Sequence, residues 1–256
     1  MHWDPTQYAR YADERGRPFV DLLARVEAVA PRRVVDLGCG PGSLTALLSS
    51  RWPGAVVEGL DSSPDMISRA AGLATDRLTF SVAAVESWLV PADADVVISN
   101  ALLQWVPSHV ELLRRWAAEL PAGGWLAFQV PGNFGAPSHV EMRSLAASAR
   151  WAGSLAGVLR GEETVLALDD YARLLMDAGL AVQAWETTYL HVLPGVDPVL
   201  EWLRGTGLRP VLAALPAAEA DEFTAALASR LSLAYPPTPH GTLFPFRRLF
   251  VVGHKP

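Results

Sequence analysis

A short glycine-rich run followed by a distant acid carries the clearest chemical signal in the sequence. Residues 36–42 read DLGCGPG, so Asp36 is followed at every second position by Gly38, Gly40 and Gly42. Because glycine has no Cβ, this spacing lets the backbone turn sharply and lets a ligand lie against main-chain atoms. Asp61 stands about 20 residues beyond the run, where a carboxylate can accept hydrogen bonds from both hydroxyls of a ribose. The pattern predicts a site for a nucleoside cofactor.

Two other interpretations of these residues stay open at this point. A dinucleotide site has the pattern Gly-x-Gly-x-x-Gly, which requires glycine where this chain has Ser43, and its helix N-terminus holds a pyrophosphate. Ser43 and Pro41 therefore disfavour a dinucleotide. Asp61 also begins the sequence Asp-Ser-Ser-Pro, which is typical of a helix start, so its carboxylate could cap that helix instead of binding a ligand.

The elements around this run alternate between strands and helices. Helical stretches separate short β-branched runs, which is typical of parallel β-α-β units, and the later part of the chain adds two more strand patterns. The seven expected strands span residues 34–37, 55–60, 78–82, 94–99, 125–130, 182–189 and 243–252. We therefore predict an α/β fold with a mostly parallel seven-stranded sheet and helices on both faces. Such a sheet binds its ligand beyond the carboxyl ends of the strands.

Two stretches interrupt this alternation. Residues 131–167 begin with the turn-rich sequence PGNFGAP, and residues 194–237 are again helical in pattern. We expect both to be insertions, after the fifth and sixth strands, that build a helical cap. Residues 1–30 are predicted to form a helical lid, in which Tyr8 and Tyr11 would exclude water, and residues 31–256 the domain that carries the site.

Composition narrows the class of partner. The chain has 256 residues, a formal net charge of -6 and one cysteine, Cys39. The negative charge argues against a nucleic acid substrate, which needs a basic face, and the single cysteine excludes an intrachain disulfide and a cysteine-rich zinc site. The histidines show no metal-ligand spacing, so we predict no metal. No apolar stretch is long enough to span a membrane and no signal sequence is evident, which favours the cytoplasm. The sequence does not specify an oligomeric state.

The glycine-rich run resembles the cofactor loop of the Rossmann-like S-adenosylmethionine (SAM)-dependent methyltransferases. Asp36, Gly38, Gly40 and Gly42 match the acidic-x-Gly-x-Gly-x-Gly spacing of that class, in which the acid faces the methionine end of SAM. The resemblance implies a Rossmann-like fold, SAM as cofactor and S-adenosylhomocysteine as product. It also implies cofactor contacts from Asp61, Ser62, Met66, Asn100 and the position of Ala84, where many members have an acid that meets the adenine.

A fuller resemblance covers nearly the whole chain and points to the trans-aconitate 2-methyltransferase family. The matching segments lie mostly outside the glycine-rich run, which makes them more specific than it. They are residues 3–8, 14–18, 61–66, 100–109, 137–143, 187–191, 206–210 and 246–250. The resemblance implies methyl-ester formation on a carboxylate of trans-aconitate or a similar small polycarboxylate.

Candidate substrate residues follow from this chemistry. A carboxylate is ionised at neutral pH and is already a nucleophile, so positioning does most of the catalysis and no catalytic base is predicted. Arginine suits the remaining carboxylates because its fork donates two parallel hydrogen bonds. The candidates are Arg17, Arg143, Arg209, Arg248, Trp105, His139 and Tyr189. A surface ion pair is the competing role for each arginine, because arginine is the ordinary cation of this chain.

Two alternative functions remain from the sequence. The same fold could methylate another small acid, a hydroxyl or an amine, because pocket residues change while the scaffold persists. A SAM-binding module without catalysis also fits, since the predicted mechanism requires no identifiable base.

Overall fold

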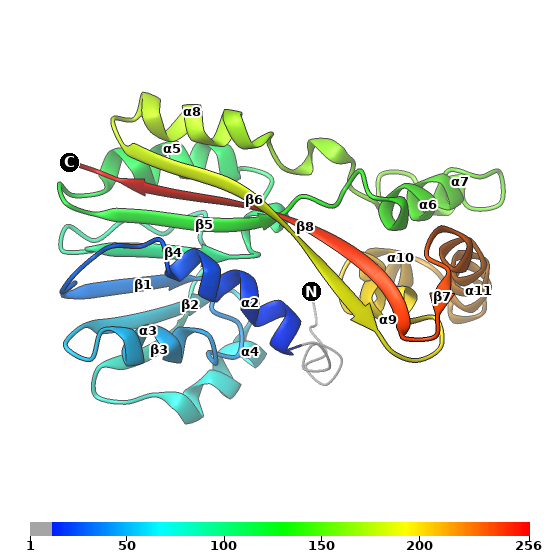
Figure 1. Cartoon of the computed structure of the whole chain (residues 1–256), viewed down its shortest axis with the longest axis horizontal. Helices are drawn as coiled ribbons and strands as arrows, with labels where there is room; N and C mark the ends of the chain where they lie inside the picture. The colour runs from blue at the N-terminus through cyan, green and yellow to red at the C-terminus, as the bar shows by residue number, and fades with distance from the viewer. Residues whose placement is uncertain (1–11) are drawn as a thin grey trace.

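A mixed β-sheet forms the centre of the computed structural model, which describes residues 12–256 (Figure 1). The strand order is β3-β2-β1-β4-β5-β8-β6, with β8 antiparallel to both of its neighbours and the other strands parallel. The strands are β1 (Arg33–Leu37), β2 (Val56–Asp61), β3 (Leu78–Val82), β4 (Val96–Asn100), β5 (Trp125–Pro131), β6 (Ala181–Leu193) and β8 (Gly241–His254). This order confirms the predicted Rossmann-like seven-stranded sheet, and a two-residue strand, β7 (Pro237–Thr238), adds to β8.

Helices connect the strands and build the two insertions. Those packed around the sheet are α2 (Ala12–Leu23), α3 (Thr45–Arg51), α4 (Pro64–Ala70), α5 (His109–Glu119) and α8 (Leu168–Asp177). Those of the insertions are α6 (Pro137–Ala146), α7 (Ala152–Leu155), α9 (Pro198–Arg204), α10 (Arg209–Ala214) and α11 (Ala217–Ala234). Short 3-10 turns are η1 (Ala71–Leu73), η2 (Leu103–Trp105) and η3 (Glu162–Thr164).

Local sequence signals fix where several helices begin and end. Ser63 caps α4, because its hydroxyl accepts a hydrogen bond from the N–H of Met66 at 3.4 Å, and Pro64 occupies the first turn, where its missing N–H is not needed. Gly179 ends α8 with a φ of 86°, which glycine adopts without strain. The start of α4 and the end of α8 thus follow from the local sequence.

Each face of the sheet has its own hydrophobic core. On one face α5 and α8 pack on the sheet through buried side chains such as Trp116 and Tyr171. On the other face α2 and α3 pack through Phe19, Leu22 and Leu48. The predicted arrangement of helices on both faces is therefore confirmed.

A third core lies beyond the end of the sheet. Strands β6 and β8 run past the other strands as a long twisted pair, and the insertion helices gather around its far end (Figure 1). Trp202 of α9, Phe223 of α11 and Met142 of α6 share this core with Phe244 and Phe246 of β8. The segments at 131–167 and 194–237 are thus joined in one helical cap.

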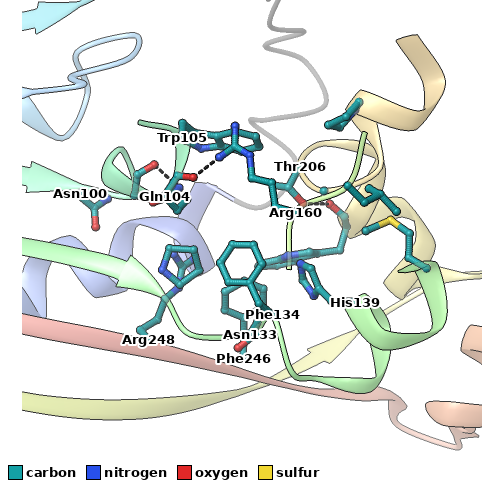
Figure 2. Close-up of a pocket in the computed structure, with 17 residues that line it drawn as sticks. Asn100, Gln104, Trp105, Asn133, Phe134, His139, Arg160, Thr206, Phe246 and Arg248 are labelled. Carbon is teal, nitrogen blue, oxygen red and sulfur yellow. Dashed lines mark hydrogen bonds between the residues drawn. The ribbon is translucent and has the colours of Figure 1, made fainter. Parts of the chain in front are cut away.

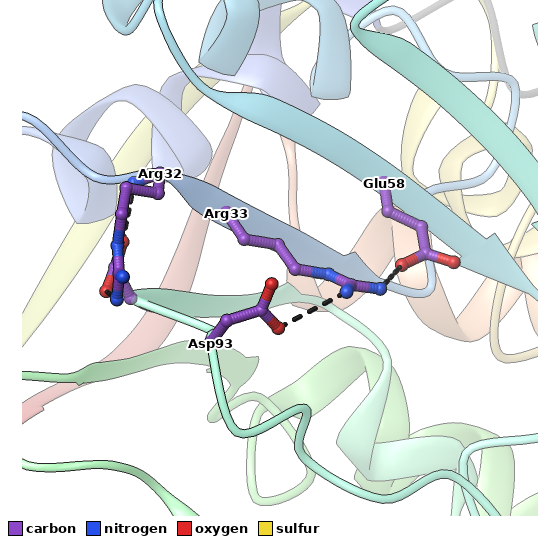
Figure 3. A network of polar contacts seen from close by, with 5 residues as sticks. Arg32, Arg33, Glu58 and Asp93 are labelled. Atoms are coloured by element: carbon purple, nitrogen blue, oxygen red, sulfur yellow. Dashed lines mark hydrogen bonds and ion pairs between the residues drawn. The ribbon is translucent and has the colours of Figure 1, made fainter.

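An ion-pair network joins three strands at the opposite end of the sheet from the cap (Figure 3). Arg33 of β1 pairs with Glu58 of β2 at 2.9 Å and with Asp93, before β4, at 3.3 Å. Arg32 pairs with Asp95 at 3.0 Å, and its hydrogen bond to that carboxylate lowers the pKa of Asp95. Because these pairs are exposed or partly exposed, water and salt screen them and their contribution to stability is small.

Candidate functional site

The glycine-rich run forms a tight loop between β1 and α3. The N–H groups of Gly38 and Cys39 both donate to the carbonyl of Leu60, at 2.7 and 3.0 Å, which ties the loop to the carboxyl end of β2. Gly38, Gly40 and Gly42 have φ values of 77°, 55° and 83°. This left-handed region disfavours residues with a side chain, so the sequence needs glycine at all three positions.

Packing separates the roles of these glycines. A Cβ on Gly38 would lie 2.9 Å from Leu102, and one on Gly42 would lie 2.8 Å from the ring of Phe80. A Cβ on Gly40 would meet nothing within 4 Å. Gly38 and Gly42 therefore pack the loop against its neighbours, while the bare backbone at Gly40 faces open space that a ligand can fill.

Asp61, at the end of β2, is both a turn acceptor and a candidate ligand. One carboxylate oxygen accepts the N–H of Gly40 at 3.0 Å, and the other accepts the N–H of Ser63 at 2.8 Å. The helix-start role that competed with ribose binding is therefore present in the structure. A carboxylate offers about four acceptor positions, however, so both oxygens keep capacity for ribose hydroxyls.

Asp36 lies beneath the loop in a dry environment. Its side chain is only 2% exposed and accepts a hydrogen bond from the Thr45 hydroxyl at 2.6 Å. Burial raises the pKa of Asp36 from 3.8 to about 7, the negative charge of Asp61 adds to the rise, and the Thr45 hydrogen bond opposes it. A nearby cation would stabilise the ionised form of this buried carboxylate.

A cavity lies along this loop; we call it the loop cavity. It is lined by Asp36, Gly38, Cys39, Gly40, Pro41, Ser43, Leu44, Asp61, Ser62, Met66, Asn100, Ala101, Leu102 and Trp105, with Phe19 of α2. Most of the predicted cofactor residues are therefore brought together around one space. Two are not: Gly42 packs against Phe80, and Ala84 is exposed after β3 and does not line the cavity.

A second cavity, here called the cap cavity, lies between the carboxyl edge of the sheet and the cap (Figure 2). It encloses about 1020 Å³, open solvent at its mouth included. Its walls come from the segment after β4, both insertions and β8. Asn100, Ala101 and Trp105 also line the loop cavity. The two spaces therefore meet at the carboxyl end of β4.

The backbone at this junction is held in an uncommon conformation. Ala101 has a φ of 56°, which costs a residue with a Cβ about 1–2 kcal/mol. Its N–H donates to the carbonyl of Gln129 at 2.9 Å, and its carbonyl accepts from the side chain of Gln104 at 2.5 Å. These bonds hold the turn that exposes Asn100 to both cavities.

Cations gather in the cap cavity. The guanidinium carbon of Arg248 lies 4.5 Å from the ring centre of Phe246, and one of its nitrogens donates to the side-chain oxygen of Gln129 at 3.4 Å. Arg160 stacks on Trp105 at 4.6 Å and donates to the main-chain carbonyl of Gln104. Within residues 12–256, the lining holds these two arginines and neither an aspartate nor a glutamate.

His139 is the third basic residue of this lining. Burial, followed by the nearby charge of Arg143, lowers the pKa of His139 to about 4. Its Nδ1 lies 3.2 Å from the Ser138 hydroxyl. The imidazole is therefore neutral at physiological pH, where it can exchange hydrogen bonds but does not add charge.

The predicted substrate residues divide into two groups. Trp105, His139 and Arg248 line the cap cavity, whereas Tyr189, Arg17, Arg143 and Arg209 do not. The hydroxyl of Tyr189 donates to the Asp21 carboxylate; burial, followed by this bond, raises its pKa. Arg143 donates to the Phe134 carbonyl at 2.6 Å and so positions the 131–137 turn.

Arg17 and Arg209 lie near the site without lining it. Arg17 is an exposed residue of α2 whose charge acts on Tyr189. Arg209 is half-buried at the start of α10, next to Pro210, which does line the cap cavity.

Four polar lining residues were not among the predicted site residues: Gln104, Asn133, Arg160 and Thr206. Asn133 lies two residues after the end of β5, so the rule that ligands bind beyond the carboxyl ends of strands could have identified it. Gln104 belongs to the segment after β4 that we had matched to the family. No sequence signal singled out Arg160, because it lies in a loop with no periodic pattern and reaches Trp105 only after the cap folds back.

The described residues contain neither a metal-binding cluster nor a membrane-spanning helix. No cluster of three or more His, Cys, Asp or Glu side chains suited to a metal ion occurs within residues 12–256. In the same part of the chain, no helix has the length and apolar character required to cross a membrane.

Comparison with known proteins agrees with this fold. The Bacillus subtilis protein YcgJ superimposes with a TM-score of 0.58 at 17% identity, covering 93% of this chain and 98% of that one. A Haemonchus contortus phosphoethanolamine N-methyltransferase, solved with S-adenosyl-L-methionine, gives 0.55 at 18% identity; the match covers 94% of this chain and 52% of that longer one. The family described as "Methyltransferase domain" matches residues 8–184. The chain therefore has a Rossmann-like methyltransferase fold and belongs to this methyltransferase domain family.

Closer relatives refine this class. A protein named trans-aconitate 2-methyltransferase from Rhodococcus jostii is 57% identical over 98% of both chains. Proteins of the same name from Streptomyces avermitilis and Mycolicibacterium gilvum are 52% and 56% identical, covering 99% and 98% of this chain and 97% and 98% of their own. The chain belongs to the trans-aconitate 2-methyltransferase family.

Proposed function

We propose that the protein transfers a methyl group from SAM to one carboxylate of trans-aconitate or a similar small polycarboxylate, forming a methyl ester. Its relatives carry that acceptor in their names. The observation in this structure that supports the proposal most directly is the lining of the cap cavity. Two arginines and a neutral histidine, in an aromatic lining whose described side chains include no acid, favour an anionic acceptor.

The loop cavity fits SAM. Gly40 leaves open space against its backbone, and Asp61 keeps acceptor capacity for ribose hydroxyls. Asp36 is a buried carboxylate whose raised pKa a cationic methionine end would lower again. These residues, with Ser62 and Met66, would hold the cofactor, while Asn100 lies where its reacting end would meet the acceptor.

The chemistry demands positioning more than proton transfer. When bound, SAM supplies an electrophilic methyl group on a positively charged sulfur, and S-adenosylhomocysteine is the product. The ionised acceptor carboxylate is already a nucleophile, so the chain has to align it with that methyl group and exclude water. Asn100, Ala101 and Trp105 form the wall common to both cavities, where this alignment would occur.

A labelled-methyl assay tests the proposal. The protein is incubated with methyl-labelled SAM and a panel containing trans-aconitate, other tricarboxylates, small hydroxyls and amines. We expect labelled ester on trans-aconitate or a close polycarboxylate, released by mild alkali. Labelling of a hydroxyl or amine only, or SAM binding without transfer to any compound, would refute the assignment.

The proposal extends to other parts of the molecule. The insertions at 131–167 and 194–237 act as one cap over the acceptor, with residues 1–30 as a lid; residues 1–11, with Tyr8 and Tyr11, lie outside the described part. The acceptor is a small molecule and not a nucleic acid, and the protein works in the cytoplasm. The net charge of -6 and the single cysteine support both statements.

A further inference from the structure

The cap cavity contains polar groups whose arrangement indicates how the acceptor is recognised. Arg160 and Arg248 enter it from opposite sides, Arg160 beside Trp105 and Arg248 beside Phe246 (Figure 2). Arg160 comes from the loop after α7 and Arg248 from β8. The two cations therefore belong to structurally independent walls.

Arg160 is available to bind an anion. Its only described hydrogen bond is to the main-chain carbonyl of Gln104, and no carboxylate among the described side chains pairs with it. Burial lowers its pKa, because no anion offsets the loss of hydration. A guanidinium has five N–H donors, so most of its donor capacity is unused.

Asn133 supplies a second, independent observation. It is 2% exposed and lines the cavity, and its side-chain oxygen accepts the N–H of Arg247 at 2.5 Å. That bond fixes which side-chain atom is the oxygen, because a main-chain N–H can only donate. The remaining amide nitrogen is buried without a partner. A buried donor without a partner costs about 1–3 kcal/mol, which a bound acceptor atom would remove.

We propose that Arg160 is a specificity-determining residue that binds a spectator carboxylate of the acceptor, with Arg248 and the amide of Asn133 binding the remaining charge. The reacting carboxylate then lies at the wall formed by Asn100, Ala101 and Trp105. A monocarboxylate cannot reach both cations while it also meets the methyl donor. The cavity thus selects for acids with several carboxylates. This inference rests on the proposed function.

The test compares Arg160→Gln, Arg160→Lys and the wild type on trans-aconitate and on the dicarboxylates that lack each of its carboxylates in turn. Loss of a charge-assisted hydrogen bond is expected to lower kcat/KM for trans-aconitate about 10- to 150-fold. For the dicarboxylate that lacks the group bound by Arg160, the same substitution should lower kcat/KM by less than about threefold. Lysine should retain part of the activity, because it keeps the charge but not the fork.

Arg150→Gln is the matched control. Arg150 is also a cap arginine stacked on a tryptophan, at 4.3 Å from Trp151, but it pairs with Glu219 and Glu222 on the surface. Its substitution should leave every kcat/KM unchanged. Affinity for S-adenosylhomocysteine and the melting temperature should match the wild type in all variants. Equal loss on every acceptor, or no loss on trans-aconitate, would overturn the role of Arg160.

A binding measurement separates this inference from the proposed function. Titration of trans-aconitate into protein saturated with S-adenosylhomocysteine reports acceptor binding without turnover. If the wild type binds the acid in an Arg160-dependent way but transfers no methyl group, the proposed function fails and the inference stands. If the wild type methylates or binds the acid and Arg160→Gln does so equally well, the inference fails alone. Absence of any polycarboxylate binding overturns both.

Discussion

Replacing Asp36 with asparagine should make the protein more stable and less able to bind its cofactor. Burial, with the Asp61 charge adding to it, raises the pKa of this carboxyl from 3.8 to about 7, a shift of roughly three units. At about 1.4 kcal/mol per unit, keeping Asp36 ionised in the folded protein costs up to about 4 kcal/mol at pH 7 and above. Asparagine removes that cost and can still accept the Thr45 hydrogen bond. We expect Asp36→Asn to raise the free energy of unfolding by about 2–4 kcal/mol.

The pH dependence gives this prediction its sign. Because the folded-state pKa is raised, the folded wild type binds more protons than the unfolded chain between pH 4 and 7. This contribution makes wild-type stability fall as pH rises through that window and level off above it. The variant lacks the contribution, so urea unfolding at several pH values should give nearly equal stabilities at pH 4 and the full difference at pH 8. A difference that does not change with pH would refute the reasoning.

The same substitution should weaken SAM binding, because a carboxylate beside the cationic methionine end is replaced by a neutral amide. The wild type should release a proton when it binds SAM near pH 6, since the cation lowers the pKa of Asp36. Calorimetry in buffers of different ionisation enthalpy measures this release, which should be absent in the variant. Equally tight binding with the same proton release would show that Asp36 does not face the cofactor.

Three further predictions concern the loop and the cap cavity. Asp61→Ala should weaken SAM binding about 10- to 150-fold by calorimetry, and unchanged affinity would contradict ribose binding. Gly42→Ala should lower the free energy of unfolding by about 2–4 kcal/mol, because left-handed strain adds to the clash with Phe80; Gly123→Ala, with a φ of 79° and no neighbour within 4 Å, should cost only about 1–2 kcal/mol. Because the pKa of His139 is near 4, the pH profile of kcat/KM should show no inflection from this histidine between pH 5.5 and 8. An inflection near pH 6.5 that His139→Gln removes would refute this prediction.

The parts of the molecule that sequence predicted well are those set by local backbone chemistry. The alternating glycines are needed because left-handed φ values occur at three alternate positions of the loop. The central strands β1 and β4 were located from short β-branched runs, because these strands are buried on both faces. Residues 78–82 were predicted to the residue, whereas the sixth strand continues four residues beyond the expected end at Tyr189. That extension is stabilised by pairing with β8 and by the core of the cap, which local patterning does not report.

The cap cavity shows where sequence reasoning reached its limit. Arginine does line the cap cavity. The four arginine candidates could not be ranked from the sequence, because a long side chain can reach in several directions. Arg143 turns to the Phe134 carbonyl and Arg248 enters the cavity, and both choices depend on tertiary packing. Arg160 was overlooked because its partner, Trp105, lies 55 positions earlier in the chain and becomes its neighbour only through the fold.

The separation of the three hydrophobic cores explains how one scaffold can change its acceptor. The loop cavity is built on the sheet, whose cores include side chains from β1, β2 and β4. The cap has its own core around Trp202 and Phe223 and reaches the sheet mainly through the long β6 and β8 pair. Substitutions in the cap therefore change acceptor contacts such as that of Arg160 without repacking the residues beneath the glycine loop. Ala101 lies at the boundary, and since its strained turn is held by Gln104 and Gln129 from the sheet side, the position at which the two cavities meet stays fixed while the opposite wall of the cap cavity varies.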